Sequence, residues 1–231
     1  LYQCPEISAA AKRWSWQRDT MGRSGKVVFA LRSDPARTRD GDQRLVRLIA
    51  LAYGAVAIAG GTLAYYFAGG QPLVHPRPWF IVPGYAAAPL SAALGVALAF
   101  GIVLFTRVTV GRYRWAQRLH LELSPIARRF DSNQIWLLAA MSSLGEELLF
   151  RSFLTPLVGL WPAALLFGLL HQVRGPSRWV WALWAFVVGL SFGALFAATG
   201  SIVGPILAHA LVNGTNLGFL KSYQPRAEAA V

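Results

Sequence analysis

The sequence predicts an all-α protein, a polytopic membrane helical bundle of about six transmembrane helices. Three observations lead to this fold class: the composition, a series of apolar segments, and the distribution of Lys and Arg. Of the 231 residues, 55% are hydrophobic and 14% are charged, whereas soluble domains average about 25% charged residues. The mean hydropathy is +0.43. This composition excludes a disordered chain and disfavours a soluble enzyme.

Six apolar segments account for the predicted helices. A bilayer core about 30 Å thick is crossed by a helix of about 20 apolar residues. Five segments reach that length, and the short one, 161–173, is expected to be tilted or partly re-entrant. Turns rich in Gly and Pro separate the segments. In chain order they are 45–68, 85–106, 134–158, 161–173, 179–199 and 201–220.

The positive charges give this bundle an orientation. With a cytoplasmic N-terminus, the cytoplasmic regions carry 20 of the 22 Lys and Arg residues. Such a bias is typical of cytoplasmic loops, so we expect both termini in the cytoplasm. It also explains the net charge of +12 without nucleic acid. These regions are 1–47, 107–133, 174–178 and 221–231.

Within the linker 107–133, the stretch 107–130 differs from the other charged regions. Arg, Trp and Leu alternate there at roughly helical spacing, which predicts an amphipathic helix lying on the cytoplasmic membrane surface. A solvated basic loop is the alternative.

The N-terminal region shows no targeting signal. No apolar run of signal-peptide length precedes residue 45, so no cleaved secretory signal is expected. Because the sequence begins with Leu1, Met21 is a candidate start, and we assign little function to residues 1–40. Cys4 is the single cysteine, which excludes an intramolecular disulfide and a zinc–thiolate cluster.

Polar and ionisable residues inside the spans point to function. Each costs about 2.5–3.5 kcal/mol to place in a membrane helix, and they gather in the third, fourth and sixth segments. These residues are Glu146, Glu147, Arg151, His171, His209 and the amide Asn213.

Helical spacing predicts how these side chains group. Glu147 and Arg151 are four residues apart and can pair on one helix face, whereas Glu146 points about 100° away. His209 and Asn213 also share a face. A carboxylate and an imidazole near one water form a general base, and a second imidazole with an amide can stabilise an oxyanion. The set therefore suits amide hydrolysis without a covalent nucleophile.

Three motifs carry a family resemblance. They are EExxxR at 146–151, FxxxH at 167–171 and HxxxN at 209–213. In this order they resemble the CAAX protease and bacteriocin-processing family, also called the Abi family, of intramembrane glutamic endopeptidases. The resemblance covers about residues 134–220. Family members often have about eight spans, so the six predicted here suggest a shorter N-terminal part.

The resemblance implies a role for each matching residue. Glu146 would be the catalytic base that activates water together with His171. Glu147 and Arg151 would support the site structurally, with Phe167 packed around it. His209 and Asn213 would form the oxyanion hole. Eukaryotic family members cleave a C-terminal tripeptide from prenylated proteins. The expected partners are therefore the lipid bilayer and a membrane-associated protein or peptide: a prenylated CAAX-type end, a leader or a C-terminal tail.

Three alternatives remain open. Two Glu and two His could bind Zn²⁺, but the helical zinc-protease motif HExxH is absent, so we expect no metal and no other cofactor. Buried Glu, His and Arg could form a proton relay in a transporter, although two symmetric halves are lacking. A non-catalytic scaffold or immunity protein could share the fold.

The chain is expected to divide into four regions. A basic cytoplasmic N-terminal segment, 1–44, precedes two spans and the amphipathic linker, 45–133. The catalytic membrane core is 134–220, and 221–231 is a cytoplasmic tail. The Ala-, Arg- and Gly-rich composition, without eukaryotic retention signals, favours a bacterial plasma (inner) membrane.

Overall fold

The computed structural model describes residues 35–225, which form helices and no strand, with one isolated antiparallel bridge between Val74 and Ser201. The predicted all-α class is confirmed. Most of the predicted N-terminal segment, including Cys4 and Met21, lies outside the described residues, as does the end of the predicted tail. In chain order the helices are α1 (Pro35–Phe67), α2 (Gly84–Arg112), α3 (Arg114–Ala127), α4 (Ser132–Glu147), η1 (Leu148–Leu154), α5 (Thr155–Val158), α6 (Leu160–Leu170), α7 (Arg178–Thr199) and α8 (Val203–Ser222).

Three of these helices, α1 from Asp42 onward, α2 and α7, are long and apolar enough to cross a membrane. Helix α6 is apolar but has only 11 residues, as expected for the short fourth segment. The third segment is divided among α4, η1 and α5. A helical membrane bundle is confirmed, while the number of six spans stays a prediction.

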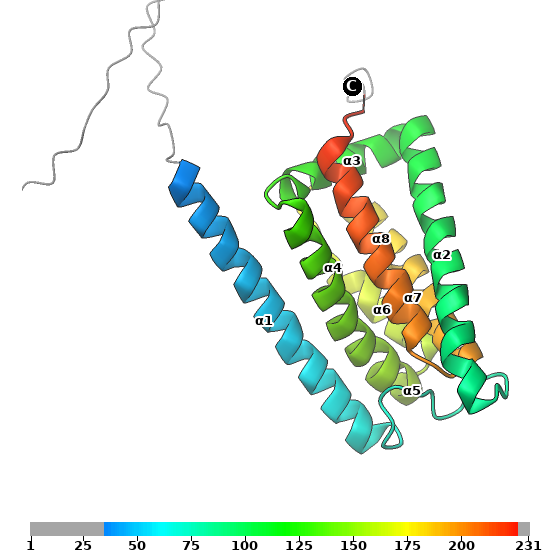
Figure 1. Ribbon diagram of the computed structural model, residues 1–231. Helices are drawn as coiled ribbons and strands as arrows, with labels where there is room; N and C mark the ends of the chain where they lie inside the picture. The colour runs from blue at the N-terminus through cyan, green and yellow to red at the C-terminus, as the bar shows by residue number, and fades with distance from the viewer. Residues whose placement is uncertain (1–34, 226–231) are drawn as a thin grey trace, which may run out of the picture.

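Helix α8 lies inside the bundle and carries His209 and Asn213 (Figure 1). It packs against α2 and α4, and against α3 near its C-terminal end, whereas α6 packs on α7. Helix α1 lies on the outside, against α4 and η1. Apolar side chains of α2, α7 and α8 form the main core cluster, which includes Ala99, Ile102, Val188, Phe192, Ala208 and Val212.

Small residues bring α2 and α8 into close contact. A Cβ atom on Gly95 would collide with the backbone of Gly204, and one on Gly204 would collide with the backbone of Ser91. The buried Ser91 hydroxyl donates to the Ser201 carbonyl at 2.8 Å and accepts from the Gly204 N–H at 3.0 Å. Close backbone approach with satisfied polar groups is typical of membrane helix packing. These contacts fix the start of α8.

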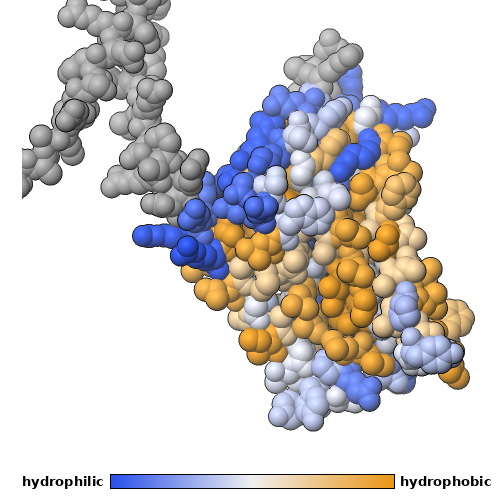
Figure 2. Space-filling view, in the orientation of Figure 1, coloured by the Kyte–Doolittle hydropathy of each residue, from blue (hydrophilic) through white to orange (hydrophobic). Residues whose placement is uncertain are grey.

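Hydrophilic residues gather mainly at one end of the molecule, with a smaller group at the opposite end and a broad apolar band between them (Figure 2). At the end with the larger group, α1 begins, α8 ends and α3 lies across the bundle (Figure 1). Helix α3 buries Ala116, Leu119, His120, Ser124 and Ala127. The linker thus contains the amphipathic helix and not the alternative basic loop. Its position at a membrane surface, the orientation of the termini and the type of membrane remain predictions.

Candidate active site

The two adjacent glutamates lie at the end of α4, where a π-helical segment follows. A capping box begins α4: the Asp131 side chain accepts from the Gln134 N–H, and the Gln134 side chain accepts from the Asp131 N–H, both at 2.9 Å. At about 1.5 Å per residue, Glu146 is about 21 Å along the helix from Ser132. Helix α4 ends at Glu147, and η1 continues it. Such π-helical turns are rare and are frequent at functional sites.

Glu147 connects two other helical elements from a fully buried position. Its Oε2 atom is 3.1 Å from Arg151 Nε in η1, and its Oε1 atom is 2.7 Å from His209 Nδ1 in α8. Arg151 Nη2 donates to the Gly189 carbonyl at 3.1 Å, and the guanidinium lies over the Phe167 ring at 4.4 Å. Buried charges are tolerated when they are paired in this way. We call Glu147, Arg151 and His209 the support cluster.

His171 occupies a helix end and not the helix interior that its place in segment 161–173 suggested. Helix α6 ends at Leu170, and His171 is its C-cap residue. The His171 N–H bonds to the Gly168 carbonyl at 3.1 Å, which leaves the Phe167 carbonyl without its usual helical donor. The His171 Nδ1 atom takes that place at 2.7 Å. The ring is therefore held by the helix end itself.

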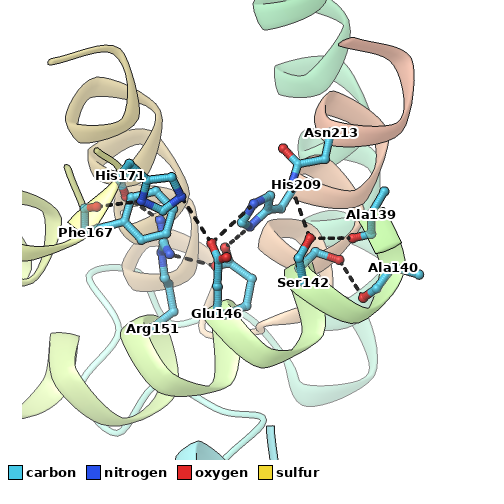
Figure 3. Close-up of polar contacts among 12 residues, drawn as sticks. Ala139, Ala140, Ser142, Glu146, Arg151, Phe167, His171, His209 and Asn213 are labelled. Atoms are coloured by element: carbon cyan, nitrogen blue, oxygen red, sulfur yellow. Dashed lines mark hydrogen bonds and ion pairs between the residues drawn. The ribbon is translucent and has the colours of Figure 1, made fainter. Parts of the chain in front are cut away.

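Glu146 faces both histidines. Its Oε2 atom is 3.6 Å from His171 Nε2 and 3.7 Å from His209 Nε2 (Figure 3). These distances exceed those of ordinary hydrogen bonds, and Oε2 is buried without a hydrogen-bond partner. The Glu146 side chain is 12% exposed, against 0% for Glu147. One carboxylate oxygen therefore remains free to accept a proton.

Asn213 lies one helical turn beyond His209 on α8. Its Nδ2 atom donates to the Ser142 hydroxyl at 3.3 Å, and that hydroxyl bonds to the Ala139 carbonyl at 3.3 Å (Figure 3). Both bonds are long, and Asn213 is half-buried. The amide thus has a donor that a ligand could engage. We call Glu146, His171 and Asn213 the open cluster.

Five of the seven predicted site residues line one cavity of about 260 Å³. They are Glu146, Phe167, His171, His209 and Asn213. The other two, Glu147 and Arg151, have side chains only 0% and 2% exposed and lie behind the cavity wall. The cavity continues to α3 and the end of α8 through a largely aromatic lining that includes Phe105, Trp115, Trp181, Trp184 and Phe219.

Hydrogen-bond partners define the protonation of the two imidazoles. The Phe167 carbonyl can only accept, so His171 Nδ1 carries a proton and the lone pair of the neutral ring is on Nε2, facing Glu146. His209 Nδ1 faces the ionised Glu147 and donates to it. His209 Nε2 can then donate a hydrogen bond only when the ring is an imidazolium. A water between Glu146 and His171 would meet two proton acceptors.

Within residues 35–225, no group of three or more His, Cys, Asp or Glu side chains has an arrangement that could hold a metal ion. Glu146, His171 and His209 nevertheless converge, at the distances given above.

Two residues near Glu146 were not singled out from the sequence. Ser142 is one helical turn before Glu146 on α4 and bonds to Asn213, so its spacing was a usable signal. Tyr53 on α1 also lines the cavity. Its only sequence signal is that a tyrosine in the middle of an apolar span lies outside the interfacial zones where tyrosines gather.

Comparison with known proteins agrees with this geometry. Residues 130–215 match the model of the family described as type II CAAX prenyl endopeptidase Rce1-like. This match includes every residue of the support and open clusters.

A curated relative, the uncharacterized protein YpbD of Bacillus subtilis (strain 168), is 32% identical over 76 residues. The aligned part is 33% of this chain and 40% of the relative, so the chain matches less than half of the relative's length. No solved structure matches the chain. The resemblance seen in the three motifs is confirmed at the level of the family match: residues 130–215 of this chain are similar to the Rce1-like family of CAAX prenyl endopeptidases.

Proposed function

We propose that the protein is an intramembrane endopeptidase that hydrolyses a peptide bond with a water activated by Glu146 and His171. The observation that carries this proposal is the unpartnered Glu146 oxygen, which lies 3.6 Å from His171 Nε2 at the wall of a cavity. A carboxylate that is buried, adjacent to an imidazole and still short of a hydrogen-bond partner is suited to general-base chemistry. The family match supports a protease.

The proposed reaction starts with a water held between Glu146 and His171. Glu146 takes one proton from this water while the oxygen attacks the carbonyl carbon of the scissile bond. The carbonyl oxygen becomes an oxyanion, which the Asn213 amide and the His209 imidazolium stabilise by hydrogen bonds. The tetrahedral intermediate collapses, the C–N bond breaks, and the proton moves from Glu146 to the leaving amine. Glu147 and Arg151 take no proton; they hold the His209 ring.

The cavity supports a membrane-associated substrate. Aromatic and aliphatic side chains dominate its lining between the glutamates and α3, so an apolar or lipid-bearing peptide would bury surface there. We therefore propose a prenylated CAAX-type end as the substrate, with a leader or a C-terminal tail as the other candidates. The reaction proceeds without a metal, since the water is activated by side chains alone.

Cleavage of three reporter peptides by purified protein in detergent tests the proposal: a farnesylated CAAX peptide, a leader peptide and an unmodified apolar tail. Glu146→Gln keeps the volume but cannot take a proton. We expect this change to lower kcat by about 10²–10⁴-fold, the range that general-base catalysis contributes. Wild-type cleavage is expected to persist in the presence of a strong chelator.

Glu122→Gln is the matched control. Glu122 lies on α3 and accepts from the Ser177 hydroxyl at 2.8 Å, a bond that a Gln side chain can also accept. The Glu122→Gln variant should cleave the peptides at the rate of the wild type. Equal cleavage by wild type and Glu146→Gln would refute the role of Glu146, and failure of the wild type to cleave any of the three peptides would favour the scaffold alternative. Loss of activity with the chelator, restored by Zn²⁺, would overturn the metal-free reaction.

A further inference from the structure

We propose that Tyr53 on α1 positions the Glu146 carboxylate, so that α1, which lies outside the family-matched residues, forms part of the active site. The inference rests on the proposed function, because it assigns Tyr53 a role in the same reaction. Tyr53 lines the cavity together with Glu146, His171 and His209. Its ring lies against Gly145, the residue before Glu146, so that the phenol side chain and the Glu146 carboxylate line the same part of the cavity wall.

The place of Tyr53 along α1 is unusual for a membrane tyrosine. Tyrosines gather at the two membrane surfaces, where the ring is buried and the hydroxyl meets water. Tyr65 and Tyr66 fit that rule, because they lie at the end of the Asp42–Phe67 span and are 56% and 73% exposed. Tyr53 is 11 residues into this span, which is about 16 Å. A hydroxyl at that depth needs a protein partner, and Glu146 provides one.

Glycines bring α1 against α4 and η1 on both sides of the two glutamates. A Cβ atom on Gly145 would lie 2.8 Å from the Tyr53 carbonyl oxygen and 3.3 Å from its ring atom Cδ1. A Cβ atom on Gly60 would lie 2.6 Å from the Leu149 backbone nitrogen. Side chains larger than hydrogen would push α1 away at both points. The close approach therefore fixes the Tyr53 ring against the residue that precedes Glu146.

Glu146 needs such a donor. Both imidazole Nε2 atoms are farther from its Oε2 than an ordinary hydrogen bond allows, at 3.6 and 3.7 Å. A carboxylate without a close donor can rotate about its last torsion, because that torsion is broad. A phenol hydroxyl donating to one oxygen would stop this rotation and keep the other oxygen toward His171. Tyr53 is thus a positioning residue, which acts through Glu146 and takes no proton from the water.

Tyr53→Phe tests this role, because it removes the hydroxyl and keeps the ring that packs on Gly145. With the farnesylated CAAX peptide as substrate, we expect kcat to fall about 10- to 100-fold, as expected from loss of a hydrogen bond to a charged group. KM should not change, since the hydroxyl contacts Glu146 and not the substrate. Tyr66→Phe removes a hydroxyl from an exposed position of the same helix, and its kcat should equal that of the wild type.

The outcomes separate this inference from the proposed function. Wild-type kcat in Tyr53→Phe, with Glu146→Gln inactive in the same assay, would overturn the role of Tyr53 and leave the protease intact. A rise in KM at constant kcat would also overturn it, because Tyr53 would then be a substrate contact. Normal cleavage by Glu146→Gln would remove both proposals.

A second variant guards against a simple packing effect. Gly145→Ala adds one methyl group at the contact with Tyr53 and should lower kcat by moving α1. In this background Tyr53→Phe should cause little further loss, since coupled residues are not additive. A full additional loss in the double variant would contradict the coupling through α1.

Discussion

Two neighbouring carboxylates of one helix have opposite surroundings in this protein. In the support cluster, Glu147 is fully buried, and ionic partners lie at 3.1 Å and 2.7 Å from its two oxygens. In the open cluster, Glu146 faces a cavity, and its closest imidazole nitrogens are 3.6 and 3.7 Å away. Because the residues are adjacent, about 100° of helical rotation separates the buried side from the cavity side.

This difference supports different roles for the two carboxylates of a membrane protein. A buried carboxylate with an ionic or imidazole partner beside each oxygen stabilises one arrangement of helices, and Glu147 does not line the cavity. A carboxylate oxygen that lacks a hydrogen-bond partner costs more to bury, and the same oxygen can accept a proton. The support cluster joins η1 to α8, so that the two histidines beside Glu146 have fixed positions. Three variants test this comparison, in order of decreasing expected effect.

Arg151→Gln should cause the largest loss of stability. It leaves Glu147 buried without its guanidinium partner, and breaking a buried ion pair in this way costs about 3–5 kcal/mol. The free energy of unfolding in detergent, from thermal or denaturant unfolding followed by circular dichroism, measures this loss. The double variant Glu147→Gln/Arg151→Gln should lose less, since no unpaired charge remains. A single variant as stable as the wild type would show that the support cluster does not hold the helices together.

Asn213→Ala should reduce activity and leave stability almost unchanged. Its hydrogen bond to Ser142 is long, at 3.3 Å, whereas the loss of one oxyanion donor costs about 10²–10³-fold in kcat. Steady-state cleavage of the reporter peptide and a thermal unfolding curve should be recorded on the same preparation. Asn133→Ala, at an exposed position near the start of α4, is the control. A drop in melting temperature without a drop in kcat would move Asn213 from the open cluster to a structural role.

His120 extends the comparison to a buried imidazole outside both clusters. It lies on α3, its Nε2 atom is 3.0 Å from the Tyr223 carbonyl, and burial lowers its pKa, as do nearby Arg107 and Arg128. The folded protein therefore binds a proton on His120 less readily than the unfolded chain. The stability that comes from burying the neutral His120 ring is fully present above the ordinary histidine pKa of 6.5 and is lost as the pH falls below it.

The expected effect is small and can be isolated by difference. Melting temperatures of wild type and His120→Gln should converge as the pH is lowered through this range. His75, whose pKa is also lowered by burial, is present in both proteins, so its contribution cancels in the difference. A constant difference at all pH values would mean that protonation of His120 does not affect the contact between α3 and the end of α8.

The site could be predicted where it depends on local helical geometry. The four-residue spacing of Glu147 and Arg151 places them on one face of a continuous helical segment, and they pair. The same spacing places His209 and Asn213 along one side of α8, and both line the cavity. Burial of polar residues in apolar segments is costly, so their presence marked the interior of the bundle.

Features that depend on helix ends and helix docking could not be predicted in the same way. His171 lies just beyond α6, and its ring bonds to the Phe167 carbonyl in place of a backbone N–H. That carbonyl lacks a backbone donor because the helix ends there, and the position of this end was not predicted. The packing of Tyr53 on Gly145, next to Glu146, depends on α1 approaching a residue about 90 positions later in the sequence. Sequence periodicity predicts which face of a helix is buried. It predicts neither the helix against which that face packs nor the position of the contact along the helix.

With the proposed function, the depth of Glu146 along α4 would set a minimum length for a substrate that reaches it from the α3 end of the cavity. An extended peptide advances about 3.3 Å per residue, so the 21 Å between Ser132 and Glu146 corresponds to about six residues. A substrate with fewer extended residues between a bulky folded domain and its cleavage site would not reach Glu146. The bundle would then select proteins by the length of their flexible end, before any side-chain preference applies.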